Sequence, residues 1–160
     1  MARKLIFVDT ETTGLDFEQD QLVELSYATL HTPVKTLYFG VTEVPSFIDN
    51  LIGFTKRGIA GRKSTQGEID EFLRLSEGQT MVAANPTFDH NFMQKNDLFR
   101  FHYRMLDIEA MAFASGDYDE VPGLFAIQQD LKGRGYKIPE PDHTSAKDVE
   151  ALVATYKALM

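Results

Sequence analysis

The sequence KLIFVDTETTGL, at residues 4–15, sets the expected fold. The run from Lys4 to Val8 is short, continuous and rich in β-forming residues, which predicts a buried strand. Because side chains alternate across a strand, Asp9 and Glu11 are expected to project from the same face at its C-terminal end. These two like charges, about 6–7 Å apart by the strand rise, gain nothing from each other.

The Asp9–Glu11 pair is open to two interpretations. A divalent cation between or beside the carboxylates would remove their conflict, because carboxylates are the preferred ligands of Mg²⁺ and Mn²⁺. The alternative is a solvated strand end running into a turn, where Asp, Thr and Gly are ordinary. The pair alone does not decide between them.

Strands and helices are expected to alternate along the rest of the chain. Further strands are predicted over residues 22–30, 34–40, 81–84 and 103–108, and helices over residues 67–77, 88–95, 109–114, 122–132 and from Thr144 or Ser145 to Met160. The tight connection at residues 31–33 makes the second and third strands antiparallel neighbours, whereas residues 41–66 are irregular with room for one short helix. This order predicts a mixed sheet covered by helices on both faces, an α/β domain.

The composition narrows the class of protein. The chain has 160 residues, 43% of them apolar, which suits a single domain over residues 1–160 with one sizeable core. It has no cysteine, which excludes a disulfide framework, a thiolate zinc site and a cysteine nucleophile, and fits a cytoplasmic, reducing compartment. Every apolar run is shorter than the ~18 residues of a membrane span, so no membrane contact is expected.

The net charge of −8 argues against a nucleic-acid partner, because phosphate contacts usually need a basic surface. The objection weakens if several acids are concentrated in one site and neutralised by bound divalent cations. Basic side chains gather in two segments, where they either guide a nucleic-acid strand or are simply solvated. They are Lys56, Arg57, Arg62 and Lys63, then Lys132, Arg134 and Lys137.

A further acid, Asp89, follows the strand predicted at residues 81–84, in the segment Asn85-Pro86-Thr87-Phe88-Asp89. It is a candidate for the same acidic site as Asp9 and Glu11. The alternative is an acid in the first turn of a helix, where a negative charge gains ~0.3–1 kcal/mol from the helix dipole.

The segment from His143 to Asp148 offers another acid and an imidazole. Asp148 lies one helical turn before Leu152, along the edge of the buried stripe of the last helix. An inward carboxylate needs a partner, and because no Lys or Arg is supplied from that face, a metal is the natural candidate. His143 is near enough to take a proton from a metal-held water. The alternatives are a capping box, Ser145-x-x-Asp148, and a surface or capping histidine.

Three motifs, quoted together, resemble those of the DEDDh exonuclease family. They are Val8-Asp9-Thr10-Glu11-Thr12-Thr13-Gly14-Leu15, Asn85-x-x-Phe88-Asp89 and His143-x4-Asp148. The family includes the proofreading subunit of bacterial replicases, ribonuclease T and oligoribonuclease. The similarity runs from about residue 4 to residue 158, and it includes Gln21-Leu22-Val23-Glu24-Leu25 and Gly123-Leu124-x4-Gln129-Asp130-Leu131.

The resemblance implies a ribonuclease-H-like mixed five-stranded sheet with helices on both faces. It also implies a two-metal 3′-to-5′ exonuclease that releases nucleoside 5′-monophosphates from single-stranded DNA or RNA. Asp9, Glu11, Asp89 and Asp148 would hold two divalent cations, Mg²⁺ or Mn²⁺. His143 would be the general base.

The resemblance also implies contacts to the terminal nucleotide. Thr12 and Gly14 would bind the 3′ end, Leu15 would wedge against the last base, and Phe88 would stack on a base. Leu15 and Phe88 are equally well explained as core residues. A polymerase partner and a homodimer, both known among relatives, are left open.

Two positions depart from the family pattern. Ala84 stands where many relatives have a histidine, and Arg57-Gly58-Ile59 stands where many have His-Gly-Ile. Both departures bear on substrate preference rather than on catalysis.

Two rival hypotheses belong to other classes. A phosphotransferase with a D-x-D motif would use Asp9 as nucleophile, but its second acid is an aspartate, and Glu11 fits that role poorly. A catalytically silent nucleic-acid-binding or polymerase-binding module would have no chemical reason to keep inward carboxylates, which cost stability without metal.

Overall fold

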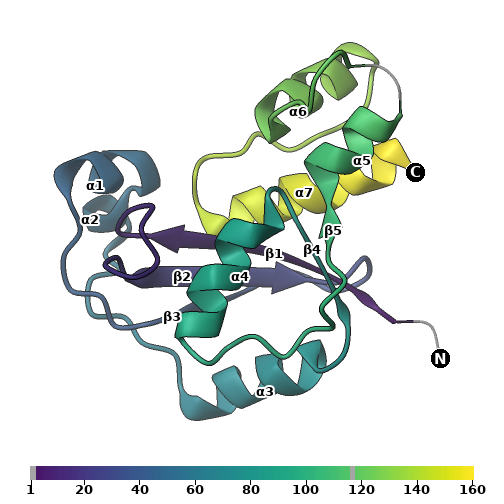
Figure 1. Cartoon of the computed structure of the whole chain (residues 1–160). Coiled ribbons are helices and arrows are strands. Elements are labelled where there is room, and N and C mark those ends of the chain that lie inside the picture. The colour runs from purple at the N-terminus through teal and green to yellow at the C-terminus, as the bar shows by residue number, and fades with distance from the viewer. Residues whose placement is uncertain (1–2, 116–117) are drawn as a thin grey trace.

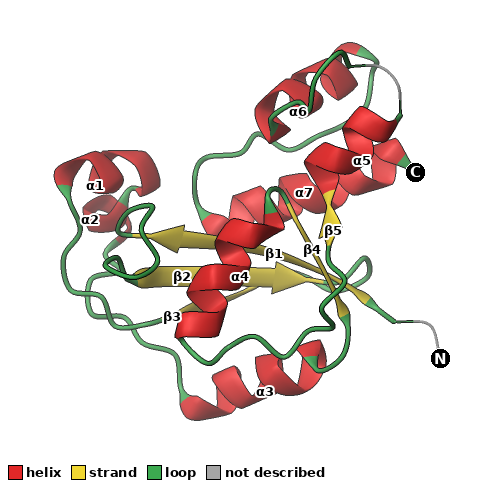
Figure 2. Ribbon diagram, in the orientation of Figure 1, coloured by secondary structure: helices red, strands yellow, loops and turns green. Residues whose placement is uncertain are grey.

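The computed structural model describes residues 3–115 and 118–160 (Figure 1). Its strands are β1 (Leu5–Thr12), β2 (Leu22–Ala28), β3 (Lys35–Tyr38), β4 (Thr80–Ala83) and β5 (Leu106–Asp107). Its helices are α1 (Ser46–Ile52), α2 (Phe54–Arg57), α3 (Gln66–Ser76), α4 (Pro86–Lys95), α5 (Ile108–Ala114), α6 (Leu124–Gly133) and α7 (Ser145–Leu159). Figure 2 shows the strands gathered at the centre with helices around them.

The described strands form one mixed sheet in the order β3-β2-β1-β4-β5. β2 is antiparallel to both β1 and β3, whereas β4 runs parallel to β1 and to β5. The short connection between β2 and β3 allows only an antiparallel return, while α1 to α3 carry the chain back so that β4 can run parallel to β1. The predicted mixed five-stranded sheet is confirmed.

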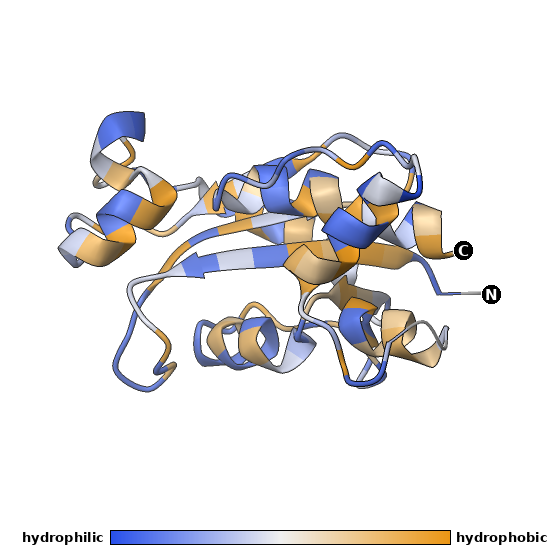
Figure 3. Cartoon of the chain, turned by 90° about the horizontal axis from the view of Figure 1, so that it is seen from above, coloured by the Kyte–Doolittle hydropathy of each residue, from blue (hydrophilic) through white to orange (hydrophobic). Residues whose placement is uncertain are grey.

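Alternate side chains of β1 pack against different layers of helices. Ile6 and Val8 lie in an apolar cluster with residues of α3 and α4, while Phe7 lies in a second cluster with residues of α5 and α7. Figure 3 shows the sheet between these layers. Because the alternation continues along the strand, Asp9 and Glu11 share the face of Phe7 and look towards α7. The helices therefore cover both faces of the sheet, as predicted.

The remaining helices extend the two ends of the sheet. α6 packs on α5 and α7, with Ile127 buried beside Ala151. α1 and α2 cover the ends of β2 and β3, where Ile52 packs in one cluster with Val23. No helix in the described part of the chain combines the length and apolarity that a membrane crossing requires.

The first strand is longer than the sequence predicted. β1 pairs with β2 as far as Thr12, which lies opposite Leu22, with a register irregularity between Glu11 and Thr12. Asp9 and Glu11 therefore lie inside the strand, not beyond its end. Strand pairing continues through the acidic residues because β2 supplies backbone partners along the whole segment.

Three other predicted boundaries were wrong. β5 has only two residues, because the Asp107 side chain accepts hydrogen bonds from the backbone of Glu109 and Ala110 and begins α5 at once. Pro122 precedes α6, since the helix begins at Leu124, whose N–H donates to Glu109. Residues 41–66 hold two short helices, α1 and α2, instead of one.

Candidate active site

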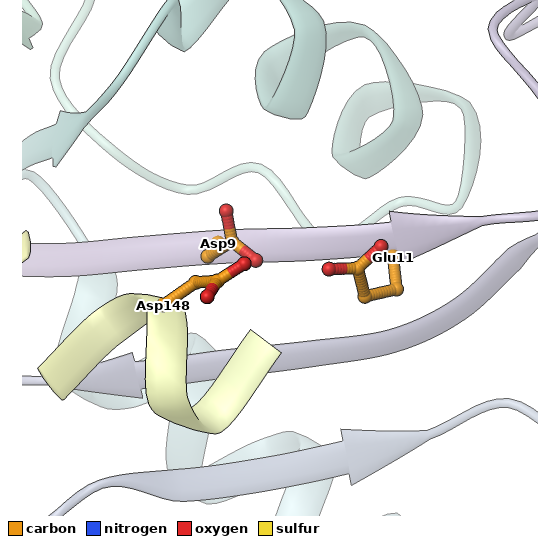
Figure 4. A group of neighbouring side chains, drawn as sticks. All are labelled: Asp9, Glu11 and Asp148. Atoms are coloured by element: carbon orange, nitrogen blue, oxygen red, sulfur yellow. The ribbon is translucent and has the colours of Figure 1, made fainter. Parts of the chain in front are cut away.

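Three carboxylates converge between β1 and α7. One oxygen from each of Asp9, Glu11 and Asp148 lies within 4.8 Å of the others. Figure 4 shows the first two projecting from β1 towards the helix that carries the third. These acids come from opposite ends of the chain, so the fold brings together what the sequence keeps apart.

The local structure of α7 explains where Asp148 points. Thr144 is the N-cap and accepts a hydrogen bond from the backbone of Lys147. Val149 and Leu152 are buried against the sheet, in the cluster that contains Phe7. Asp148 directly precedes Val149, so it lies at the edge of the buried face and reaches β1.

The capping-box alternative for Asp148 is wrong. Ser145 is not the N-cap but the first residue of α7, and both its N–H and its hydroxyl donate to Glu24. Asp148 is the fourth residue of α7, so it does not occupy the third position that a capping box requires.

The electrostatics of the acids are unfavourable without a cation. Burial, followed by the charges of neighbouring acids, raises the pKa of Asp9 well above its ordinary value and that of Glu11 to about 9. Burial also raises the pKa of Asp148 to about 6, although the nearby His143 charge acts in the opposite direction. Each carboxylate is thus held in a site that disfavours its ionised form.

The carboxylates also have unused oxygens. Asp9 Oδ2 and Asp148 Oδ1 are buried without a hydrogen-bond partner among the described residues. No ion pair in that part of the chain involves Asp9, Glu11 or Asp148. Buried charges are normally paired or coordinate a metal, and an all-oxygen donor set is the kind that Mg²⁺ and Mn²⁺ prefer. The residues present therefore fit a divalent cation.

Asp89 approaches from the other face of the sheet. It lies in the first turn of α4, is only 4% exposed, and its Oδ1 accepts a hydrogen bond of 2.7 Å from the Thr10 hydroxyl. Burial raises its pKa to about 7, with the Thr10 hydrogen bond acting in the opposite direction. Its charge contributes to the raised pKa values of Asp9 and Glu11, so it belongs to the same electrostatic cluster. It is not one of the three acids within 4.8 Å of one another.

The turn before α4 sets this approach. Asn85 has a positive φ of 49° and Pro86 occupies the first turn of the helix, so the chain leaves β4 sharply and α4 starts beside β1. β4 is paired with β1 only at Leu5 to Phe7, which leaves the edge of β1 beyond Phe7 open to the start of α4.

His143 lies on the loop before α7 and is exposed. Its φ of 57° is in the left-handed region, which a non-glycine residue rarely occupies. Its charge lowers the pKa of Asp148, which places the imidazole within electrostatic reach of that carboxylate. A residue on a solvent-exposed loop has room to turn its side chain towards the acids.

The residues expected to contact substrate differ in how exposed their side chains are. Leu15 is 87% exposed, so the core interpretation is wrong for this residue. Phe88 is half-buried and packs on Phe92 with ring centroids 5.1 Å apart, as its core interpretation expects. Thr12 is buried and its hydroxyl donates to the carbonyl of Gly14.

The loop that carries Leu15 is held in place by polar contacts. The Asp20 carboxylate accepts hydrogen bonds from the Thr13 hydroxyl and the Asp16 N–H, and Lys95 of α4 donates to the carbonyl of Asp20. Asp20 also lies so close to Gly14 that a Cβ at position 14 would collide with its carboxylate. A side chain at position 14 would therefore force the Asp20 carboxylate out of these contacts.

Sequence reasoning missed the role of Glu24, which it quoted only as part of a strand motif. Glu24 is fully buried on β2 and accepts hydrogen bonds from Arg57 and Ser145. The signal was present, since an acid inside the apolar run Leu22-Val23-Glu24-Leu25 must find a partner when it is buried. Its partners, far away in sequence, gave no signal.

Ion pairs within the protein engage several side chains of the two basic segments. Arg57 is committed to Glu24, Lys132 pairs with Glu140, and Arg134 pairs with Asp130. These three side chains are therefore engaged within the protein and are not simply available to guide a strand.

Comparison with known proteins places this site in a family. Residues 6–156 match the family model described as Exonuclease. Among curated proteins, DNA polymerase III PolC-type of Thermotoga petrophila is 27% identical over 94 residues, which cover 56% of this chain and 7% of the relative. The corresponding protein of Streptococcus thermophilus is 29% identical over 96 residues, 57% of this chain and 7% of the relative.

The matched regions are thus small parts of much longer relatives. Among solved structures, Exonuclease X in complex with 5′ overhanging duplex DNA superposes with a TM-score of 0.69 at 17% identity, covering 98% of this chain and 90% of that one. This likeness confirms the ribonuclease-H-like fold. Taken with the match over residues 6–156 and the acidic cluster of Asp9, Glu11 and Asp148, it shows that the chain belongs to the exonuclease family of DEDD nucleases.

Proposed function

We propose that this nuclease is a divalent-metal-dependent 3′-to-5′ exonuclease that releases nucleoside 5′-monophosphates from single-stranded DNA or RNA. The observation that carries the proposal is the convergence of Asp9, Glu11 and Asp148. One oxygen from each lies within 4.8 Å of the others, and no ion pair among the described residues involves them. Such a cluster is costly to maintain unless it holds cations.

Four acids would hold two cations, Mg²⁺ or Mn²⁺. Asp9, Glu11 and Asp148 supply the converging oxygens, and Asp89 adds its charge from the start of α4. When bound, the cations would lower the pKa of the attacking water and offset the charge that develops on the leaving oxygen. His143 would take the proton of that water, because a neutral imidazole accepts protons near neutral pH.

The 3′ end of the strand would be bound at the C-terminal end of β1. Thr12 and Gly14 lie directly after the acids, and Leu15 presents an exposed apolar side chain beyond them. Leu15 would contact the terminal base, and Phe88 would offer its remaining exposed edge to a neighbouring base.

The wider setting is also a proposal. The chain would act as a single exonuclease domain in the cytoplasm, on nucleic-acid 3′ ends. The PolC-type relatives favour a polymerase context, although the chain matches only 7% of their length. A homodimer stays a prediction that oligomeric-state measurements can test.

The test is a set of incubations with Mn²⁺ or Mg²⁺ and end-labelled single-stranded DNA, single-stranded RNA and a mismatched duplex. With a 5′ label we expect a ladder of shortening strands, and with a 3′ label the immediate release of a labelled mononucleotide. EDTA should stop both reactions. Immediate release of a labelled mononucleotide from a 5′-labelled strand, before any ladder forms, would contradict the polarity. No product with any substrate would favour the silent binding module. The family match argues against the D-x-D phosphotransferase, which would release phosphate from small esters.

A further inference from the structure

Glu24 is a fifth acid at the site, but it is bound differently from the other four. It is 0% exposed, on β2, and faces Glu11 across the antiparallel register of β1 and β2. Its charge contributes to the raised pKa of both Asp9 and Glu11. It is therefore close enough to influence the metal-binding carboxylates.

The Glu24 carboxylate is fully engaged by protein donors. Arg57 donates through both guanidinium nitrogens, Nη1 to Oε1 at 3.2 Å and Nη2 to Oε2 at 2.7 Å. Ser145 donates to Oε1 from its backbone N–H and from its hydroxyl, both at 3.0 Å. A carboxylate has about four lone-pair sites, so these donors leave little capacity for a metal.

The partners of Glu24 connect three elements that form the site. Arg57 is the last residue of α2, Glu24 is on β2, and Ser145 is the first residue of α7. Asp148 follows Ser145 by three residues, so the two side chains lie on neighbouring positions of one helix face. The Ser145 hydroxyl also lies 2.7 Å from that of Ser26 on β2, which adds a second contact at the same point.

We propose that Glu24 is a positioning residue for the metal site. Its carboxylate fixes the first turn of α7 to β2 through Ser145, and so sets the place of Asp148 relative to Asp9 and Glu11. Arg57 pairs the charge of Glu24, so that this acid stays an anchor for the helix instead of a competing metal ligand. The inference rests on the proposed function and adds a residue outside the predicted site to it.

The test compares two double variants of equal net charge. Glu24→Gln with Arg57→Met removes the ion pair but keeps a carbonyl oxygen that can accept from Ser145. Glu24→Ala with Arg57→Met removes the ion pair and the acceptor together. Because both variants lack the same two charges, a difference between them reports the anchor and not the electrostatics. The matched control is Lys35→Met with Glu71→Gln, which removes an exposed ion pair between β3 and α3.

Three measurements on the full chain separate the anchor from the metal chemistry. Mn²⁺ affinity is measured from the EPR signal of free Mn²⁺, and thermal unfolding checks that each variant is folded. Loss of a group that orients metal ligands typically costs ~10–100-fold in metal affinity. We expect that loss for the alanine double variant relative to the glutamine one, and wild-type affinity for the control. Amide exchange at Ser145 should be faster in the alanine double variant with or without Mn²⁺.

The outcomes distinguish the two proposals. If the wild-type chain binds Mn²⁺ and both double variants bind it equally well, the positioning role of Glu24 is wrong. If the wild-type chain binds no Mn²⁺ while Ser145 still exchanges faster in the alanine variant, the anchor exists and the metal-dependent function is wrong. Equal exchange at Ser145 in the two folded variants would contradict the anchor directly.

Discussion

Replacing Asp148 with asparagine should stabilise the metal-free protein while abolishing its nuclease activity. The folded state raises the pKa of Asp148 from 3.8 to about 6, mainly through burial. The protonated form is therefore favoured by folding. Its stabilising effect is present below the unfolded-state pKa and is lost as the pH rises through about 6.

The size of the effect follows from this shift. At ~1.4 kcal/mol for each pH unit, the rise in the pKa of Asp148 corresponds to a penalty of ~3 kcal/mol when the carboxylate is ionised at pH 7.5. The amide of asparagine also loses hydration, so we expect a net gain of ~1–2 kcal/mol for Asp148→Asn. In a chain of this size ~1 kcal/mol raises the Tm by ~2–4 °C, which predicts an increase of ~2–8 °C.

The assay is thermal unfolding in EDTA at pH 7.5 and again near pH 4.5, with Glu150→Gln as the control. Glu150 is on the same helix but lies on its exposed face, paired with Lys147 at 3.0 Å, so its loss should change the Tm very little. The gain for Asp148→Asn should shrink near pH 4.5, where the wild-type carboxyl is protonated. Saturating Mn²⁺ should stabilise the wild-type chain and not the variant. An unchanged or lower Tm for Asp148→Asn in EDTA at pH 7.5 would refute the reasoning.

Three further predictions concern the site. The metal-free protein should lose stability as the pH rises from about 5 to 9, because the pKa values of Glu11 and Asp89 are raised to about 9 and about 7 in the folded state. Urea unfolding in EDTA across this pH range measures the loss. A free energy of unfolding that does not change with pH would contradict the prediction. His143→Ala should slow hydrolysis by ~10²–10⁴-fold at saturating Mn²⁺ while leaving Mn²⁺ binding intact. An unchanged rate of hydrolysis would show that His143 is not the general base. Leu15→Ala should raise the KM for single-stranded substrates several-fold with little change in Tm, because the side chain is 87% exposed. Steady-state kinetics and a thermal melt measure the two quantities. A clear fall in Tm together with the rise in KM would indicate a packing role for Leu15 instead.

Local patterns were sufficient for most of the fold and for selecting three acids that the fold brings together, Asp9, Glu11 and Asp148. The apolar run that ends at Val8 and the periodicity of Val149 and Leu152 each identify one buried element, and the three motifs then connect these elements to a family. The end of β1 could not be read in the same way, because only pairing with β2 shows that the strand continues to Thr12. A polar segment is strand or turn depending on a neighbour that the sequence does not reveal.

The partners within the site were also beyond sequence reasoning. That Arg57 is the counter-ion of Glu24 depends on where α2 ends relative to β2, which no local pattern specifies. That Asp89 lies outside the group of three acids likewise depends on the sharp turn at Asn85 and on which face of the sheet α4 covers. The spacing of motifs along the sequence does not specify how far apart these side chains lie in the folded protein.

The separation of the site along the chain has a consequence for biosynthesis. Asp9 and Glu11 are translated well before Asp148, because Asp148 belongs to α7, which begins only at Ser145 and docks against β1 (Figure 1). A nascent polypeptide therefore carries an incomplete set of acids until that helix has been translated and has packed. An unfinished copy of this nuclease would therefore lack the complete acidic cluster until translation of that helix is over.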